Sequence, residues 1–107
     1  MEFEELMKFV RKENIKLGEY FGQKEKSYHR ALAQTVKLGE EYGELCDEIL
    51  SANKDQRKEK LESKCSNLDE ELADVILTTL LLSDIMDVDI ENSIKEKMKK
   101  IEKRYKQ

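Results

Sequence analysis

The stretch VILTTLLLSDIM, residues 75–86, is the most apolar part of the chain and decides the fold. Its eight large apolar residues point in nearly every direction around a helix axis. Twelve residues interrupted by Thr, Ser and Asp are too short for the roughly 20 that span a bilayer. We therefore expect a helix that is covered by protein on all sides, and no membrane partner.

Cover for this helix must come from a chain of 107 residues in which 41% are charged and 38% are hydrophobic. That length supports one core, so we expect a single domain over residues 1–107. Three charged helices of one short chain would leave part of the apolar helix exposed. This predicts that a second copy supplies the remaining cover, in a homodimer or a dimer-of-dimers tetramer.

Apolar residues recur at steps of three and four along most of the remaining sequence, which predicts helices over residues 2–21, 27–51, 67–86 and 89–105. Prolines are absent and there are only four glycines, so an all-β fold is excluded. Ser27, Asn67 and Asp89 are the expected N-caps. We expect an all-α fold, a four-helix bundle completed by homo-oligomerisation.

Two of the predicted helices have a clear apolar stripe. The second helix should turn its stripe inward, and this stripe consists of Leu38, Tyr42, Leu45 and Ile49. The last helix has a similar stripe beside its cations, formed by Ile90, Ile94, Met98, Ile101 and Tyr105. The polar segment 52–66, ANKDQRKEKLESKCS, is consistent with a loop, a mobile helix or a lid.

Charge is distributed unevenly along the chain. The formal net charge is −4, yet the residues from Lys95 onward carry seven cations against two anions, or +5. The overall negative field disfavours a nucleic-acid partner. The two cysteines form no Cys-x-x-Cys pair, and the first residues do not resemble a signal peptide, so we expect a reducing cytoplasm.

Two segments thirty residues apart share one pattern of acids. Residues 38–45, LGEEYGEL, and residues 68–75, LDEELADV, both read Leu-x-Glu-Glu-x-x-acid-apolar. Glu41 and Glu44 lie on one helix face, and Glu71 and Asp74 do the same on another. Both acids of the first pair should flank the inner stripe, at the seam where a neighbouring helix brings the second pair alongside.

Four carboxylates gathered in this way repel one another unless a cation compensates them. Ligands that are all oxygen favour Mg²⁺, with Mn²⁺ next, over zinc. Because Mg²⁺ commonly completes its coordination with a substrate's phosphates, such a site predicts phosphoryl chemistry. The alternative is a solvated helix face, since a chain with 24 acids contains such pairs by chance. Gly43, in the middle of a predicted helix, favours the first interpretation, because it suggests close helix approach.

At these residues the sequence resembles the MazG-like family of all-α nucleoside triphosphate pyrophosphohydrolases. The family pattern Glu-Glu-x-x-Glu followed by Glu-x-x-Asp corresponds here to residues 40–44 and 71–74, and the similarity covers roughly residues 27–105. It implies hydrolysis of (deoxy)nucleoside triphosphates to monophosphates and pyrophosphate, in a house-cleaning role. It also implies a Mg²⁺ site formed by Glu41, Glu44, Glu71 and Asp74, with Glu41 and Glu44 counted as catalytic.

Further residues are candidates for catalysis or substrate binding. Glu48, one turn beyond Glu44, is a candidate ligand or water-orienting base. Three cations at steps of three and four on the last helix could clamp phosphate oxygens, although dipole compensation also explains them: Lys97, Lys100 and Arg104. Relatives place base-contacting residues near the positions of Tyr28 and His29, although packing or a surface role is the favoured alternative for His29. Phe21 and Tyr42 are further stacking candidates.

Two other functions remain open at this point. Phosphoribosyl-ATP pyrophosphohydrolases share the same helical superfamily, so they are the rival within the enzyme class. The rival outside it is a noncatalytic helical adaptor, in which the acids are surface charge and residues 75–86 form a docking seam.

Overall fold

The computed structural model describes residues 1–53 and 67–106, and all regular structure in these two ranges is helical. Its helices are α1 (Phe3–Tyr20), α2 (Tyr28–Asn53), α4 (Leu68–Ile85) and α5 (Ile90–Tyr105). The predicted all-α class with four helices is therefore confirmed for the described ranges. The prediction of a loop or lid over 52–66 concerns mainly residues 54–66, which lie outside them. In the described part, no helix is both long and apolar enough to cross a membrane.

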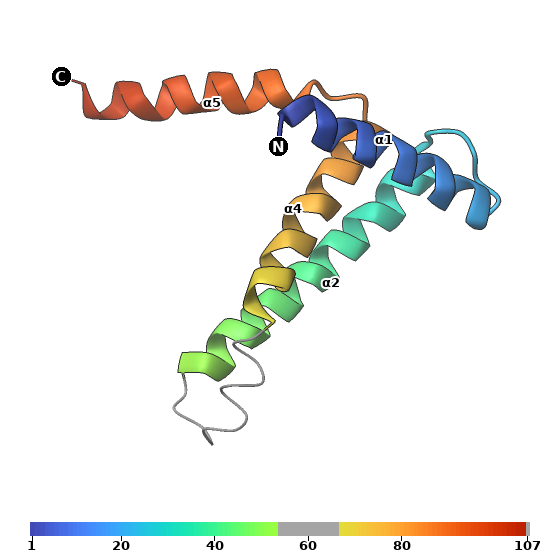
Figure 1. Ribbon diagram of the computed structural model, residues 1–107, viewed down its shortest axis with the longest axis horizontal. Coiled ribbons are helices and arrows are strands. Elements are labelled where there is room, and N and C mark those ends of the chain that lie inside the picture. Colours follow the sequence, from blue (N-terminus) through green and yellow to red (C-terminus); the bar gives the residue numbers. More distant parts are fainter. Residues whose placement is uncertain (54–66, 107) are drawn as a thin grey trace.

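The helices α2 and α4 run side by side in opposite directions, and α1 crosses one end of this pair (Figure 1). The core lies at this crossing, where Met7 and Val10 of α1 pack with Leu80 of α4. Since α2 and α4 are antiparallel, the second half of α2 lies beside the first half of α4, away from α1. Both acidic segments are in these halves.

The inward face of α2 differs from the predicted one. Tyr42 is 60% exposed and Ile49 is 42% exposed, so the predicted stripe is wrong at these two positions. Glu41 is buried instead of flanking the stripe. The buried and half-buried line follows steps of three and four through Ala31, Gln34, Leu38, Glu41, Leu45 and Glu48. Acids therefore occupy positions that face α4.

Two of the three predicted N-caps form the expected hydrogen bond. The Ser27 hydroxyl accepts from the Arg30 N–H at 3.1 Å, and the Asp89 carboxylate accepts from the Asn92 N–H at 3.2 Å. Asn67 stands at the N-cap position of α4, but its side chain makes no capping bond. The carboxylate of Asp69 accepts from the Glu70 N–H at 3.0 Å at that helix start.

The loop between α1 and α2 is held against the fold at both of its ends. The Gln23 N–H donates to the Gly18 carbonyl at 2.7 Å, and a Cβ on Gly18 would meet the Gln23 carbonyl oxygen at 2.7 Å. Lys26 bridges Asp87, at 2.8 Å, and Asp84, at 3.5 Å, in the segment where α4 ends. These contacts fix the loop beside α4.

One chain does not cover all of its apolar helices. Leu72 and Ile76 of α4 are 46% and 57% exposed, so the all-round cover expected for this helix is not provided within the described part of the chain. The helix α5 projects away from the other three described helices, and none of its residues is buried (Figure 1). The oligomer expected to cover these faces remains a prediction.

Candidate metal centre

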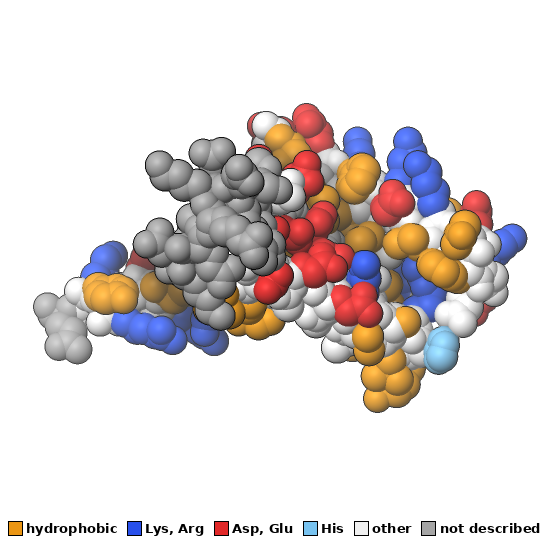
Figure 2. Space-filling model, turned by 90° about the horizontal axis from the view of Figure 1, so that it is seen from below, with side chains coloured by type: hydrophobic (Ala, Val, Ile, Leu, Met, Phe, Trp, Pro, Cys, Tyr) orange, Lys and Arg blue, Asp and Glu red, His pale blue; other side chains and the backbone are white. Residues whose placement is uncertain are grey.

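Carboxylates from α2 and α4 meet where the two helices run side by side. Glu41 and Glu44 of α2 and Glu71 of α4 each offer one oxygen, and these three oxygens lie within 4.8 Å of one another. Figure 2 shows Asp and Glu side chains gathered in the middle of one face of the molecule. The antiparallel pairing thus brings together acids that are thirty residues apart in the sequence.

Two other predicted acids lie around this cluster. Asp74 is exposed and is not one of the three convergent residues. Its charge nevertheless acts on Glu71, as does that of Glu48. The pKa of Glu71 is raised above its ordinary value, first by burial and then by repulsion from Glu44, Asp74, Glu41 and Glu48. The acids of the cluster therefore repel one another, and in the described part of the chain the cluster contains no cation of its own to compensate their charge.

Buried oxygens in this cluster and beside it lack hydrogen-bond partners among the described residues. They are the Oε2 atoms of Glu41, Glu48 and Glu71. A buried carboxylate oxygen without a partner is costly, because the water that it loses is not replaced. Hard divalent cations such as Mg²⁺ take the carboxylate oxygens of Glu and Asp as ligands. The residues present therefore fit a divalent cation.

Lys37 compensates part of this charge. Its ammonium nitrogen lies 3.1 Å from Glu41 Oε1 and 3.8 Å from Glu40 Oε2. The hydrogen bond to Glu41 is the main reason why the pKa of Lys37 is raised above its ordinary value. The sequence prediction did not include Lys37. Its spacing of four residues before Glu41, which favours a helical ion pair, was the available signal.

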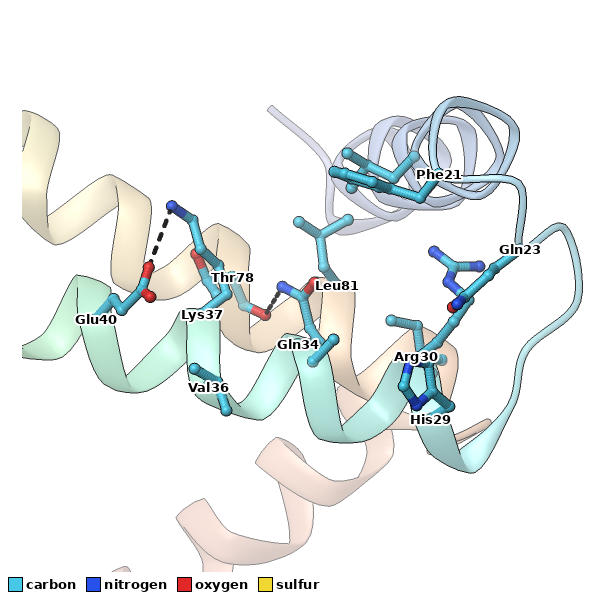
Figure 3. A pocket seen from close by; sticks show the side chains of 13 residues that line it. Phe21, Gln23, His29, Arg30, Gln34, Val36, Lys37, Glu40, Thr78 and Leu81 are labelled. Atoms are coloured by element: carbon cyan, nitrogen blue, oxygen red, sulfur yellow. Dashed lines mark hydrogen bonds and ion pairs between the residues drawn. The ribbon is translucent and has the colours of Figure 1, made fainter.

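A pocket of about 640 Å³ adjoins the cluster between α2, α4 and the loop after α1. Lys37 and Glu40 lie at one end of it, and Phe21, Gln23 and Arg30 lie toward the other (Figure 3). Between them, Gln34 Nε2 donates to the Thr78 carbonyl oxygen at 3.2 Å. The pocket thus combines an aromatic side chain with several hydrogen-bonding groups.

The predicted substrate-binding residues do not all reach this pocket. His29 and Phe21 line it, whereas Tyr28 is 77% exposed and is not among the lining residues. The cations Lys97, Lys100 and Arg104 are exposed on α5, which points away from the α2–α4 pair (Figure 1). One chain therefore brings together three of the four predicted metal ligands but not the predicted phosphate clamp.

Gly43 does not mark a close approach of helices within the chain. A Cβ added at this glycine would have no neighbour within 4 Å among the described residues. The expectation that Gly43 allows a neighbouring helix to come close is therefore wrong for the described part of a single chain.

Comparison with known protein families gives a match over most of the chain. A family model described as the MazG nucleotide pyrophosphohydrolase domain matches residues 27–107. The match contains both acidic segments and α5, and it leaves out α1. Neither the curated proteins nor the solved structures include a match to the chain.

Proposed function

This chain belongs to the MazG nucleotide pyrophosphohydrolase family, and we propose that it is a Mg²⁺-dependent nucleoside triphosphate pyrophosphohydrolase. It converts a (deoxy)nucleoside triphosphate to the monophosphate and pyrophosphate, in a house-cleaning role in the cytoplasm. The single domain of residues 1–107 carries this activity. The observation that supports the proposal most is the convergence of Glu41, Glu44 and Glu71, with buried oxygens that have no partner among the described residues.

The metal ligands in this proposal are Glu41, Glu44 and Glu71, with Asp74 as the fourth. Asp74 stands one helical turn after Glu71, so a side-chain rotation on the same helix face brings it toward the cluster. A bound Mg²⁺ or Mn²⁺ would neutralise phosphate charge and lower the pKa of water at the site. The protein contributes fixed carboxylates, which hold the reacting groups in line.

Glu48 is the proposed base for the attacking water. Its buried Oε2 has no partner in the described part of the chain, and its charge acts on Glu71, so it lies close to the cluster. The water oxygen forms a bond to phosphorus, the link between the α and β phosphates breaks, and pyrophosphate leaves with the bond's electron pair. The proton from the water passes to the Glu48 carboxylate.

The pocket beside the cluster is the proposed site for the nucleoside. Residues 30 to 41 of α2 span about 16 Å at the rise of a helix, so the pocket and the metal centre are neighbours along one helix. Phe21 provides an aromatic face for stacking, and His29, Arg30 and Gln34 provide polar groups for base or sugar. Tyr28, which precedes His29 in α2, is a further proposed contact.

A second copy of the chain completes the proposed site. The helix α5 carries exposed apolar residues beside Lys97, Lys100 and Arg104, while the cluster on α2 and α4 is negative. Opposite charges favour docking of α5 from one protomer near the acids of its partner. Exposed Leu72 and Ile76 on α4 would be covered in the same homodimer, or in a dimer-of-dimers tetramer.

The test is product analysis with a panel of nucleotides, with and without Mg²⁺, for the wild type and Glu41→Gln. We expect Mg²⁺-dependent release of pyrophosphate and monophosphate, which Glu41→Gln abolishes. Phosphoribosyl-ATP belongs in the panel, because hydrolysis of that compound alone would support the rival enzyme activity. Absence of metal-dependent hydrolysis for every compound would contradict the proposal and favour the helical adaptor.

A further inference from the structure

Lys37 lies at the boundary between the proposed metal centre and the pocket. It lines the pocket, and its ammonium group contacts Glu41, a member of the convergent acids. Figure 3 shows it extending from α2 beside Glu40. A ligand that reaches from the pocket to Glu41 would therefore lie beside this side chain.

The ion pair with Glu41 joins two side chains in different environments. The Glu41 side chain is only 10% exposed, whereas that of Lys37 is 56% exposed. Glu41 cannot easily move to water, but the flexible stem of Lys37 can turn without disturbing the core. The ammonium holds Oε1 only, and Oε2 of Glu41 has no partner among the described residues.

Lys37 thus provides positive charge at Glu41 when no metal is bound. A bound divalent cation would supply that charge instead. The Lys37 ammonium and a divalent cation would repel each other if both contacted Glu41, because like charges at such distances oppose each other. The next acceptor of Lys37 is Glu40, at 3.8 Å, but Glu40 is 60% exposed and such surface pairs contribute little. A lysine displaced from Glu41 therefore remains available to another anion.

We infer that Lys37 exchanges partners during binding. It neutralises Glu41 when the metal is absent, and it donates to a phosphate oxygen of the substrate when metal and nucleotide are bound. Lys37 is thus a phosphate-binding residue of this chain, in addition to the proposed clamp of Lys97, Lys100 and Arg104. This inference rests on the proposed function, since it requires a metal ion at Glu41 and a polyphosphate beside it.

The exchange predicts opposite effects of one substitution, measured by isothermal titration calorimetry. Lys37→Met keeps the unbranched stem and removes the charge. Mg²⁺ alone should bind to this variant roughly two- to fivefold more tightly than to the wild type, because a competing cation is gone. The Mg²⁺ complex of inorganic tripolyphosphate should bind on the order of tenfold more weakly, because a charge-assisted hydrogen bond is lost.

Two further variants control this experiment. Lys99→Met removes an exposed ion pair with Glu96 on α5, and both affinities should stay at the wild-type values. Lys37→Arg keeps the charge, so Mg²⁺ alone should bind to it as it does to the wild type. This variant can still be measured if Lys37→Met fails to fold. Unchanged affinities in Lys37→Met, or shifts of both in the same direction, would overturn the role of Lys37. Failure of the wild type to bind Mg²⁺ at all would instead overturn the proposed function, and this inference with it.

Discussion

Glu41 and Glu71 come from different helices and stand thirty residues apart, yet each offers an oxygen within 4.8 Å of the other's. Each also has a buried Oε2 atom without a hydrogen-bond partner among the described residues. Such a pair destabilises the metal-free fold and is relieved by a bound cation. The consequence can be measured as a change in stability, independently of any enzyme assay.

Glu71→Gln should therefore raise the melting temperature of the metal-free protein, because it removes a charge that its neighbours repel. In the wild type, Mg²⁺ at a hundred times its Kd should add about 2.7 kcal/mol to the free energy of unfolding. The variant should lose most of that gain. Thermal melts with EDTA or Mg²⁺ test this, with Glu70→Gln, an exposed neighbour on α4, as the matched control. Equal responses of both variants to Mg²⁺ would refute the assignment of Glu71 as a ligand.

Mixing of two inactive variants tests whether α5 acts on the partner's site. Glu41→Gln removes a ligand and Arg104→Met removes a clamp residue, so each homodimer should be inactive. Random exchange of protomers makes half of the dimers mixed. In a mixed dimer, one site contains both substitutions and the other contains neither, so one site of two is intact. Activity should thus recover to about a quarter of the wild-type rate after mixing. If Arg104 acts within its own chain, mixing will restore nothing.

Gly18→Ala should destabilise the protein, because its Cβ would lie 2.7 Å from the Gln23 carbonyl oxygen and force the loop away from α1. We expect a loss of about 1–3 kcal/mol in the free energy of unfolding, measured with urea. Gly39→Ala is the control. It has no neighbour within 4 Å among the described residues and lies inside α2, so it should gain up to about 1 kcal/mol. A neutral result for Gly18→Ala would show that the loop is not fixed as described.

The bridge from Lys26 to Asp87 and Asp84 should make stability depend on alkaline pH. The hydrogen bond to Asp87 is the main reason why the pKa of Lys26 is raised from 10.5. A lysine with a raised pKa stabilises the fold below that ordinary value, and the stabilisation disappears as pH rises through the higher folded pKa. Lys26 is partly exposed, so about 0.5–1 kcal/mol is at stake.

Denaturation at pH 8 and at pH 11 measures this effect. The difference in stability between the wild type and Lys26→Met should shrink at the higher pH. Lys12→Met, which changes an exposed lysine on α1, should show no such trend. A constant difference between the wild type and Lys26→Met would mean that the bridge does not form in solution.

The helices were predictable because local rules determine them, and so was the meeting of acids from α2 and α4, although Asp74 is not one of the three convergent residues. Apolar residues at steps of three and four located each helix to within a few residues. Ser27 and Asp89 formed the caps expected from their type and position. The repeated frame around Glu41 and Glu71 indicated convergence, since two antiparallel helices bring equivalent faces together.

The orientation of α2 was not predictable in the same way. An apolar pattern assigns the inward face to Tyr42 and Ile49, but the structure turns Glu41 inward. That rotation depends on α4, whose own acid Glu71 faces the same seam. Buried acids are ordinarily excluded from a core, so the pattern contained no sign of them. Lys37 was missed for a different reason, because its spacing of four residues before Glu41 was a signal that the prediction did not use. The direction of α5 is set by the corner at Asp87, which has a φ of 54°.

The most direct test of the central claim is to locate a divalent cation in crystals grown with Mn²⁺, by its anomalous scattering. We expect a peak bounded by carboxylate oxygens of Glu41, Glu44 and Glu71, with Asp74 rotated toward it. A crystal in which these side chains contact no ion, while Mn²⁺ binds elsewhere, would contradict that claim.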